Sequence, residues 1–455
     1  MITETAAIPN DLLLTDLYQL NMMQAYLDHD VTKPAVFEFF VRRLPKTRNF
    51  LLSAGLEQVV SFLQTAKPDP RTLQWLKDSG RFGSDFIDYL DNFVFRGDLH
   101  AIPEGTPVFA NEPLIRVTAP LPVAQLLETR LINLLHPSVL VASKAARMKL
   151  AAPGKALVDF GFRRAHGAEA GLLAARSSYL AGFAATATVP AAPLWGIPIS
   201  GTMAHSFIEA HTEEVQAFLN FARSRPDDVV LLIDTYDTER AARRVAAIAP
   251  QLRSEGIAIK GVRIDSGDLD EMSRKVRAIL DEAGLSEVQV LVSGGLDEWK
   301  LRELVASGAP IHGFGIGTAL TTSEDTPALD CAYKLQEYDG EAKRKLSSGK
   351  ATYPGRKQVW RTYTSDGCMS GDTLSLEDDD LPGTPLIEKV MEEGRLLEPL
   401  PTLESIRARA AEQLERLPES LRALEQAPEY SVRVSSRLER EAEAAARRIA
   451  AQTGG

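Results

Sequence analysis

The feature that most constrains the fold is a series of short apolar runs, each ending in glycine, an acid or a small polar residue. These runs cover residues 156–161, 229–234, 261–267, 288–295 and 312–318. The last four begin roughly 25–30 residues apart, the length of a strand–helix–strand step. Near-continuous apolar strands at this spacing are typical of a parallel sheet that helices cover on both faces.

Amphipathic stretches fill the intervals between these strands. The clearest runs from Leu269 to Ala283, where apolar residues share one face and Asp268 with Glu271 suits a capping box. The pattern predicts an α/β fold, and both an open doubly wound sheet and a closed barrel satisfy it. In either fold the ligand binds at the carboxyl ends of the strands, where functional residues are therefore expected.

The pattern of apolar, charged and turn-forming residues divides the chain into residues 1–121, 122–330 and 331–455. The first stretch mixes strands and helices and predicts an α+β domain, which part of 330–400 is expected to complete. The second opens with a long helical stretch at 123–150. The third carries short strand-like runs and then an Ala-, Arg- and Glu-rich helical tail. The clearest strand-like runs of the first stretch are 36–42, 103–109 and 113–117.

Charge and cysteine content exclude several classes of protein. The formal net charge of -11 argues against a broad surface for nucleic acid or anionic membranes. No apolar run approaches the length of a membrane span, and Met1–Thr5 lacks the basic and apolar pattern of a signal peptide. Two cysteines, Cys331 and Cys368, cannot build a disulfide framework. We expect a cytoplasmic protein without nucleic-acid or membrane partners.

Glycines end the last two strands of the series. Gly294 and Gly295 follow one, and Gly317 with Thr318 follows the other. Glycine lets backbone N–H groups approach a phosphate closely, and barrels often bind phosphate in the loops after their last two strands. Tight turns needed only for packing would give the same residues, but two such loops together favour a phosphate site.

Charged and aromatic residues follow two other strands. Arg263 and Asp265 lie two apart, so they point to one face of their strand and suit an anion beside a ribose hydroxyl or Mg²⁺. An internal salt bridge, with Asp268 as a helix cap, is the alternative. Phe160 and Arg163 offer a stacking face and a guanidinium group, although such residues also occur in cores and on solvated surfaces.

One of the seven histidines, His205, follows a Gly-Thr turn and precedes a helical run at 207–222. Imidazole is a base and nucleophile near neutral pH, but residue types alone leave catalytic and structural roles equally open. Four other histidines have no supporting neighbours and are expected in the core or on the surface. These are His29, His100, His136 and His312.

Five motifs in order resemble the nicotinate phosphoribosyltransferase family. The resemblance runs from Leu14 to Lys357 and continues more loosely to the C-terminus. The motifs are Thr15-Asp16-Leu17-Tyr18-Gln19, Asp159-Phe160-Gly161-Phe162-Arg163-Arg164, Gly201-Thr202-Met203-Ala204-His205-Ser206, Val262-Arg263-Ile264-Asp265-Ser266-Gly267-Asp268 and Gly315-Ile316-Gly317-Thr318.

The resemblance implies an irregular α/β barrel of the type II phosphoribosyltransferase kind, with an N-terminal α+β domain and a helical C-terminal extension. It implies a homodimer with shared active sites and an ATP-coupled reaction that needs Mg²⁺. Nicotinate and phosphoribosyl pyrophosphate would give nicotinate mononucleotide and pyrophosphate, and ATP would phosphorylate His205 transiently.

The other roles that the resemblance implies surround the base and the sugar phosphate. Tyr18 of the partner subunit and Phe160 correspond to two faces of an aromatic clamp. Arg163 and Arg263 correspond to anion and nicotinate contacts, and Thr202 lines the base pocket. Asp265 corresponds to the acid on the ribose or metal side. The phosphate cradle comprises Gly294, Gly295, Gly317 and Thr318.

The choice of acid over amide depends on Ala187. In the related nicotinamide-specific enzymes this position carries an Asp, which accepts from the amide and repels a carboxylate. Ala187 therefore favours nicotinate. The alternatives are a nicotinamide- or quinolinate-specific enzyme, an unrelated barrel enzyme acting on a sugar phosphate, and a nucleotide sensor that retained the fold. Quinolinate enzymes have shorter chains and work without ATP.

Overall fold

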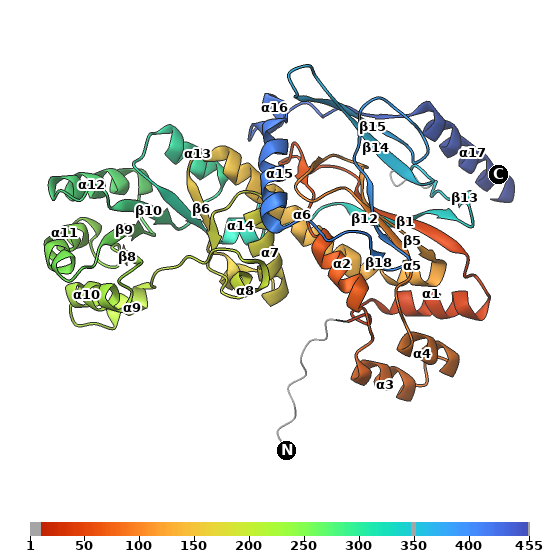
Figure 1. Ribbon diagram of the computed structural model, residues 1–455, viewed down its shortest axis with the longest axis horizontal. Coiled ribbons are helices and arrows are strands. Elements are labelled where there is room, and N and C mark those ends of the chain that lie inside the picture. The colour runs from red at the N-terminus through yellow and green to blue at the C-terminus, as the bar shows by residue number, and fades with distance from the viewer. Residues whose placement is uncertain (1–10, 347–351, 454–455) are drawn as a thin grey trace. The chain divides into compact units, whose positions relative to one another are not determined.

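The computed structural model describes residues 11–346 and 352–453, and the chain forms two compact units. The first unit runs up to Leu140 and resumes at Ala328, and the second unit is Val141–Pro327. Figure 1 shows the elements of both. Met1–Thr5, where a signal peptide would begin, lies outside the described residues.

A six-stranded parallel sheet forms the second unit, in the order β7-β6-β11-β10-β9-β8. It curls into a half-barrel, which confirms the predicted irregular α/β barrel class. All five predicted strands are present, and β7 is an additional one. The strands are β6 (Ala156–Asp159), β7 (Ala185–Thr186), β8 (Val229–Leu232), β9 (Ile259–Ile264), β10 (Gln289–Ser293) and β11 (Gly313–Ile316).

Buried apolar side chains and aspartate caps explain the alternation of strands and helices. Val262, Ile264 and Val290 are fully buried under the surrounding helices, which lie outside β8–β10 in Figure 1. Three of those helices begin after an aspartate whose carboxylate accepts from backbone N–H groups of the first turn, and Asp268 is one of them. The helices are α10 (Glu214–Ser224), α11 (Thr238–Ser254), α12 (Leu269–Glu282) and α13 (Glu298–Ala306).

Two predicted helices are each broken in two. The run expected at 207–222 is α9 (His205–Glu209) followed by α10, because the ring of His211 binds the Phe207 carbonyl and Glu213 takes an extended conformation. The helix expected at 123–150 is α5 (Leu121–Leu126) followed by α6 (Glu128–Ala151). The N–H of Leu127 bonds to the Gln125 carbonyl in a tight turn, so Glu128 begins a new helix.

A seven-stranded antiparallel sheet forms the centre of the first unit, in the order β13-β12-β1-β5-β3-β17-β18. β1 pairs with both β5 and β12, so a strand from beyond the second unit joins the middle of this sheet. Phe37 and Tyr333 stack across that junction with ring centroids 5.0 Å apart. The strands are β1 (Pro34–Val41), β3 (Asp98–Ala101), β5 (Pro113–Pro120), β12 (Cys331–Tyr338), β13 (Glu341–Ala342), β17 (Glu388–Glu392) and β18 (Arg395–Leu396).

Smaller sheets complete the first unit. The strand expected at 103–109 is only β4, which pairs with β2 rather than with its sequence neighbour β5. Within the expected helical tail, β19 is a strand that pairs in parallel with β15. The strands are β2 (Leu51–Leu52), β4 (Pro107–Val108), β14 (Lys357–Tyr363), β15 (Met369–Leu376), β16 (Thr384–Pro385) and β19 (Val432–Val434).

Helices pack around these sheets, and both cysteines are free thiols. None of the helices in the described ranges is long and apolar enough to cross a membrane. The helices are α1 (Leu17–Asp28), α2 (Leu56–Thr65), α3 (Pro70–Asp78), α4 (Ser84–Asp91), α15 (Leu403–Glu415), α16 (Glu419–Arg422) and α17 (Ser436–Thr453).

Candidate active site

His205 is the first residue of α9 and lies beside the loops that follow β8 and β9. Its Nδ1 is 3.1 Å from the hydroxyl of Thr235, and its Nε2 is 3.8 Å from Oδ2 of Asp265. The side chains of His205 and Asp265 are 38% and 32% exposed, so a ligand can reach both. One ring nitrogen therefore contacts Thr235, the other faces Asp265, and the imidazole remains accessible.

A pair of aspartates connects the loops after β8 and β9. Oδ2 of Asp234 accepts from the Asp265 backbone N–H at 2.9 Å and from the Ser266 hydroxyl at 2.6 Å. The hydroxyl of Ser293, at the end of β10, donates to Asp265. Oδ1 of Asp234 is buried and has no hydrogen-bond partner. Sequence patterns alone assign no role to Asp234, Thr235 or Ser293, although each lies at or just after the end of an apolar run.

Arg263 points from β9 toward Thr202. Its guanidinium donates to the Thr202 hydroxyl at 2.7 Å and to the Met203 carbonyl at 2.9 Å, and it lies 5.9 Å from the centroid of the Phe160 ring. No ion pair joins it to Asp265 within the described part of the chain. Burial lowers the pKa of Arg263, although Asp265 and Asp234 act in the opposite direction.

Phe160 and Arg163 follow β6. The Phe160 ring covers Gly315, where an added Cβ would lie 2.3 Å from a ring carbon. Arg163 is exposed in the short 3₁₀ helix Phe162–Arg164. Beneath them, the buried Asp159 accepts from the Thr186 hydroxyl at 2.7 Å and from the Gly161 N–H at 2.8 Å. Burial raises the pKa of Asp159, and these two hydrogen bonds oppose it.

Ala187 directly follows β7, and its methyl group is exposed. Its N–H donates to the Asp159 carbonyl at 2.7 Å, which ties this position to the end of β6. Because this residue is alanine, the position presents an uncharged surface beside the end of β6.

The predicted phosphate-cradle glycines also lie at this edge of the sheet. Gly294 has a φ of +89°, and a Cβ there would lie 2.1 Å from the Asp265 carbonyl oxygen. Only glycine fits this close approach of the loops after β9 and β10. Gly317 precedes and Thr318 begins the short helix α14 (Thr318–Thr321) after β11. The structure thus brings ten of the predicted site residues to one edge of the second unit.

Tyr18, the remaining predicted site residue, belongs to the first unit and is 47% exposed. Its hydroxyl donates to Glu128 at 3.3 Å. Burial raises the pKa of the phenol, and the negative charge of Glu128 raises it further. The hydroxyl is therefore kept in its protonated, hydrogen-bond-donating form.

Two of the histidines without expected roles serve the fold. Nε2 of His136 accepts from the Leu329 N–H at 2.8 Å, and Nδ1 of His312 accepts from the Val290 N–H at 3.1 Å. Burial lowers the pKa of both rings, which keeps them neutral acceptors.

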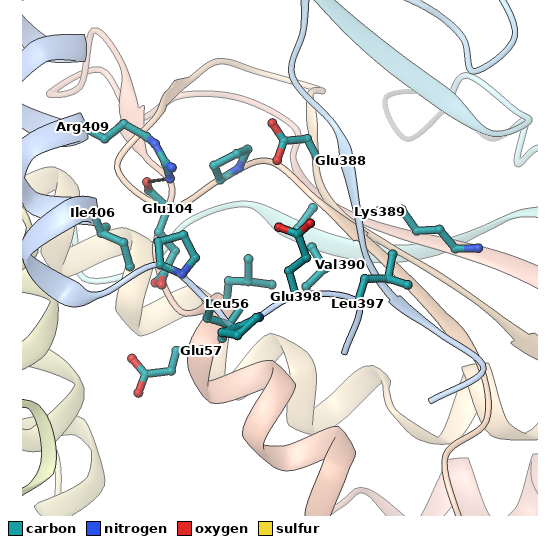
Figure 2. A pocket seen from close by; sticks show the side chains of 15 residues that line it. Leu56, Glu57, Glu104, Glu388, Lys389, Val390, Leu397, Glu398, Ile406 and Arg409 are labelled. Carbon is teal, nitrogen blue, oxygen red and sulfur yellow. Dashed lines mark hydrogen bonds between the residues drawn. The ribbon is translucent and has the colours of Figure 1, made fainter. Parts of the chain in front are cut away.

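The first unit also contains a cavity of about 280 Å³ between the start of α2, the turn after β3, the β17–β18 hairpin and α15. Figure 2 shows Glu388 and Glu398 turned toward it and Arg409 beside Glu104. The Arg409 guanidinium donates to the Glu104 carbonyl at 3.1 Å. None of the predicted site residues lines this cavity.

The donor set at the sheet edge fits a magnesium ion that is bound mainly by its substrate. Among residues 11–346 and 352–453, no group of three or more His, Cys, Asp or Glu residues could hold a metal. Mg²⁺ commonly takes only one or two carboxylates, together with substrate phosphates and water. Asp265 and Asp234 supply two neighbouring carboxylates, and the buried Oδ1 of Asp234 has an unused acceptor.

Comparisons with known proteins find one family along the chain. Three models match: the nicotinate phosphoribosyltransferase N-terminal domain (residues 13–136), the nicotinate phosphoribosyltransferase family (155–364) and its C-terminal domain (382–441). A nicotinate phosphoribosyltransferase of Mycobacterium tuberculosis is 47% identical over 94% of this chain and 92% of its own. The human one is 32% identical over 94% and 95%.

Solved structures agree with these matches. Human nicotinic acid phosphoribosyltransferase superposes with a TM-score of 0.87 at 31% identity, over 95% of this chain and 100% of that one. A nicotinate-nucleotide pyrophosphorylase of Pyrococcus furiosus gives 0.74 at 24% identity, over 91% and 99%, a likeness of fold alone.

Proposed function

Because the chain belongs to the nicotinate phosphoribosyltransferase family, we propose that its reaction is coupled to ATP through phosphorylation of His205. The reaction itself, in NAD biosynthesis, joins nicotinate to the phosphoribosyl group of phosphoribosyl pyrophosphate. The ring nitrogen of nicotinate forms a bond to C1 of the ribose, and pyrophosphate leaves.

The observation that carries the proposal is the accessible His205 ring between Thr235 and Asp265. In the coupling step, a ring nitrogen of His205 attacks the γ-phosphorus of ATP and ADP leaves. Phosphorylation adds about two negative charges at the ring. That charge would order the neighbouring loops for the sugar diphosphate, and hydrolysis of the phosphohistidine would release phosphate and return the unmodified ring.

The diphosphate is proposed to lie along the edge formed by Gly294, Gly295, Gly317 and Thr318, whose backbone N–H groups suit phosphate oxygens. Asp265 and Asp234 would hold Mg²⁺, which neutralises charge on the departing pyrophosphate when it is bound. Asp265 would also orient the ribose. Since Ser293 and Asp234 fix the Asp265 loop, this acid is preorganised for that role.

Nicotinate is proposed to stack on Phe160, with Tyr18 of the partner subunit on its other face. Arg263 lies beside the Phe160 ring and next to Thr202, so its charge would pair with the nicotinate carboxylate. Arg163 is a further, exposed cation of this region. Ala187 presents a methyl group where an acid would repel that carboxylate, which favours nicotinate over nicotinamide.

Replacing His205 by alanine tests the coupling. We expect the variant to bind no phosphoryl group from γ-labelled ATP and to lose the stimulation of product formation by ATP. A slow ATP-independent turnover should remain, because the groups that position the substrates are untouched. Labelling of the variant at the wild-type level, with product formation still dependent on ATP, would show that another residue carries the coupling.

A competition assay between nicotinate and nicotinamide, run with and without ATP, tests the substrate. We expect a higher kcat/KM for nicotinate by at least 10-fold, on the order of one lost charge-assisted hydrogen bond. Preference for the amide would overturn the assignment of Ala187. Activity on quinolinate without ATP would instead favour the quinolinate-specific alternative, and binding without turnover would favour a sensor.

A further inference from the structure

An exposed aromatic ring needs a tether if it is to stack on a ligand without a large loss of side-chain entropy. Tyr18 lies in the first turn of α1, and its ring is nearly half exposed. Its hydroxyl donates to Glu128, the first residue of α6. The two residues are far apart in sequence, so the contact depends on how α1 docks on α6.

Glu128 is a nearly buried carboxylate that gathers donors from three separate segments. Its Oε2 accepts from Gln19 Nε2 at 3.0 Å and from Gln125 Nε2 at 2.9 Å, in addition to the Tyr18 hydroxyl. Its Oε1 accepts from Lys334 Nζ at 3.0 Å. A buried carboxylate with this many donors is fixed in place, and it transmits that rigidity to each partner.

Thr129, the next residue of α6, makes a second contact with the start of α1. The Thr129 hydroxyl donates to the Asp16 carboxylate at 2.9 Å. Asp16 stands at the N-cap position of α1, yet its side chain makes no capping hydrogen bond there. Two successive residues of α6 thus bind Asp16 and Tyr18, and the first turn of α1 is anchored at both.

If Glu128 had only a structural role, its buried partners would be sufficient. Gln19 and Gln125 are buried, so they would join α1 to α6 without the phenol. The contact to Tyr18 adds nothing to the apolar core, but it orients an exposed ring and makes that ring richer in electrons. Such a face suits the pyridinium charge that develops as the nicotinate nitrogen bonds to ribose.

We propose that Glu128 is a positioning residue for nicotinate, which acts by fixing the ring of Tyr18 through the hydrogen bond to its hydroxyl. This inference rests on the proposed role of Tyr18 as one face of the aromatic clamp. Glu128 would then contribute to nicotinate binding without touching either substrate.

A double-mutant cycle tests the proposal. Tyr18→Phe keeps the ring and removes only the hydroxyl, and Glu128→Ala removes the acceptor. Each should raise the KM for nicotinate by about 5- to 10-fold, within the range of the net contribution of an ordinary hydrogen bond. The KM for phosphoribosyl pyrophosphate should not change.

The double variant should have no higher KM for nicotinate than either single variant, because both substitutions remove the same contact. Glu128→Gln, which retains an acceptor oxygen, should recover part of the loss.

Lys334→Met is the matched control, because it removes another partner of the same carboxylate and leaves Tyr18 in place. It should raise the KM for nicotinate much less than Glu128→Ala does, because Gln19 and Gln125 still bind the carboxylate oxygen that faces Tyr18. Additive effects in the cycle, or an equal rise in KM in Lys334→Met, would make Glu128 a structural residue and overturn the proposal. An unchanged KM in Tyr18→Phe would overturn it even if Glu128→Ala fails to fold. If Tyr18→Ala itself leaves the KM unchanged, the clamp role of Tyr18 fails instead.

Discussion

At the scale of single residues, Thr235 gives the candidate nucleophile its orientation. A free imidazole rotates about two side-chain bonds, whereas the hydroxyl of Thr235 holds Nδ1 of His205 at 3.1 Å. The other ring nitrogen then faces Asp265 and the open edge of the sheet. A threonine one residue beyond Asp234 thus fixes which side of the ring is presented to a ligand.

Replacing Thr235 by valine keeps the shape of the side chain and removes its hydroxyl. We expect ATP-stimulated turnover to fall about 5-fold, since a hydrogen bond contributes roughly 1 kcal/mol. Steady-state rates with and without ATP measure this, and Thr235→Ser is the control because it keeps the hydroxyl. Equal losses in both variants would place the effect in packing rather than in the contact to His205.

His100 on β3 makes the stability of the protein depend on pH. Burial, together with the positive charges of Arg116 and Lys389, lowers the pKa of His100 from 6.5 to about 4. Glu377 lies 3.6 Å from its Nε2, but Arg116 pairs with that same carboxylate, so the positive neighbours prevail. Between pH 6.5 and 4 the unfolded chain binds a proton that the folded one rejects.

The free energy of unfolding should therefore be at its full value above pH 6.5 and fall as the pH drops toward 4. Between pH 7 and pH 5 we expect His100 to account for about 1 kcal/mol of this fall, after allowing for partial solvent screening. Urea unfolding of the wild type and of His100→Gln at both pH values measures it. A fall of the same size in the variant would remove His100 as the source.

The residues of the site differ in how well a sequence reveals them. Arg263 near the end of β9, and Asp265 and the glycines just after their strands, can be proposed from sequence because α/β folds bind ligands at the carboxyl ends of strands. Asp234 and Ser293 end strands of the same series, but no local pattern separates a functional acid or hydroxyl from a helix-capping or turn residue. Glu128 carries no sequence signal, because its partners come together only when α1, α6 and β12 pack.

At the scale of elements, β11 supports the Phe160 ring from below. Gly315 leaves the space that the ring occupies, because a Cβ there would lie 2.3 and 2.4 Å from two ring carbons. Its neighbour Gly313 is less tightly enclosed, with the side chain of Leu291 at 3.1 Å from an added Cβ. The position of the stacking face is thus set by one missing side chain in a strand.

Gly315→Ala should displace the Phe160 ring and raise the KM for nicotinate by about 10-fold or more, since small misplacements of a binding group are costly. Gly313→Ala, on the same strand, should have a much smaller effect, because an added Cβ there comes no closer than 3.1 Å to Leu291 and 3.2 Å to the Ala156 carbonyl oxygen. Saturation curves for nicotinate in both variants provide the measurement. A larger effect at Gly313 would contradict this account of the ring's support.

Helices and strands with strong periodicity were predicted well, but the pairing of strands that are distant in sequence was not. The five strands of the parallel sheet and helix α12 lie within a few residues of their expected places. The break between α9 and α10 depends on a single ring contact of His211, which periodicity does not report. The pairing of β1 with β12 and of β15 with β19 joins segments distant in sequence, so local patterns carry no information about it.

At the scale of the whole molecule, the proposed clamp requires two subunits, because Tyr18 is expected to act in its partner's site. The Tyr18→Ala and His205→Ala chains should each have little activity at low nicotinate concentration. When the two are co-expressed, mixed dimers contain one site with both Tyr18 and His205 intact. Random pairing should restore about a quarter of the wild-type activity.

Activity of the mixed preparation, compared with each variant alone, measures this complementation. A sizing column run on the same sample shows whether dimers form. Activity that stays at the sum of the two variants, in a sample that is dimeric, would mean that each subunit builds its site alone.

The junction of β1 with β12 also dictates an order of events on the ribosome. While β1 emerges early, its neighbour β12 is translated only after the whole second unit. The second unit is contiguous, so it can fold as soon as it is complete, whereas the first must keep an apolar strand edge unpaired until Tyr338 has emerged. The second unit can therefore complete its folding before the first unit does. The nascent N-terminal segment is the part of the chain that most needs protection from aggregation.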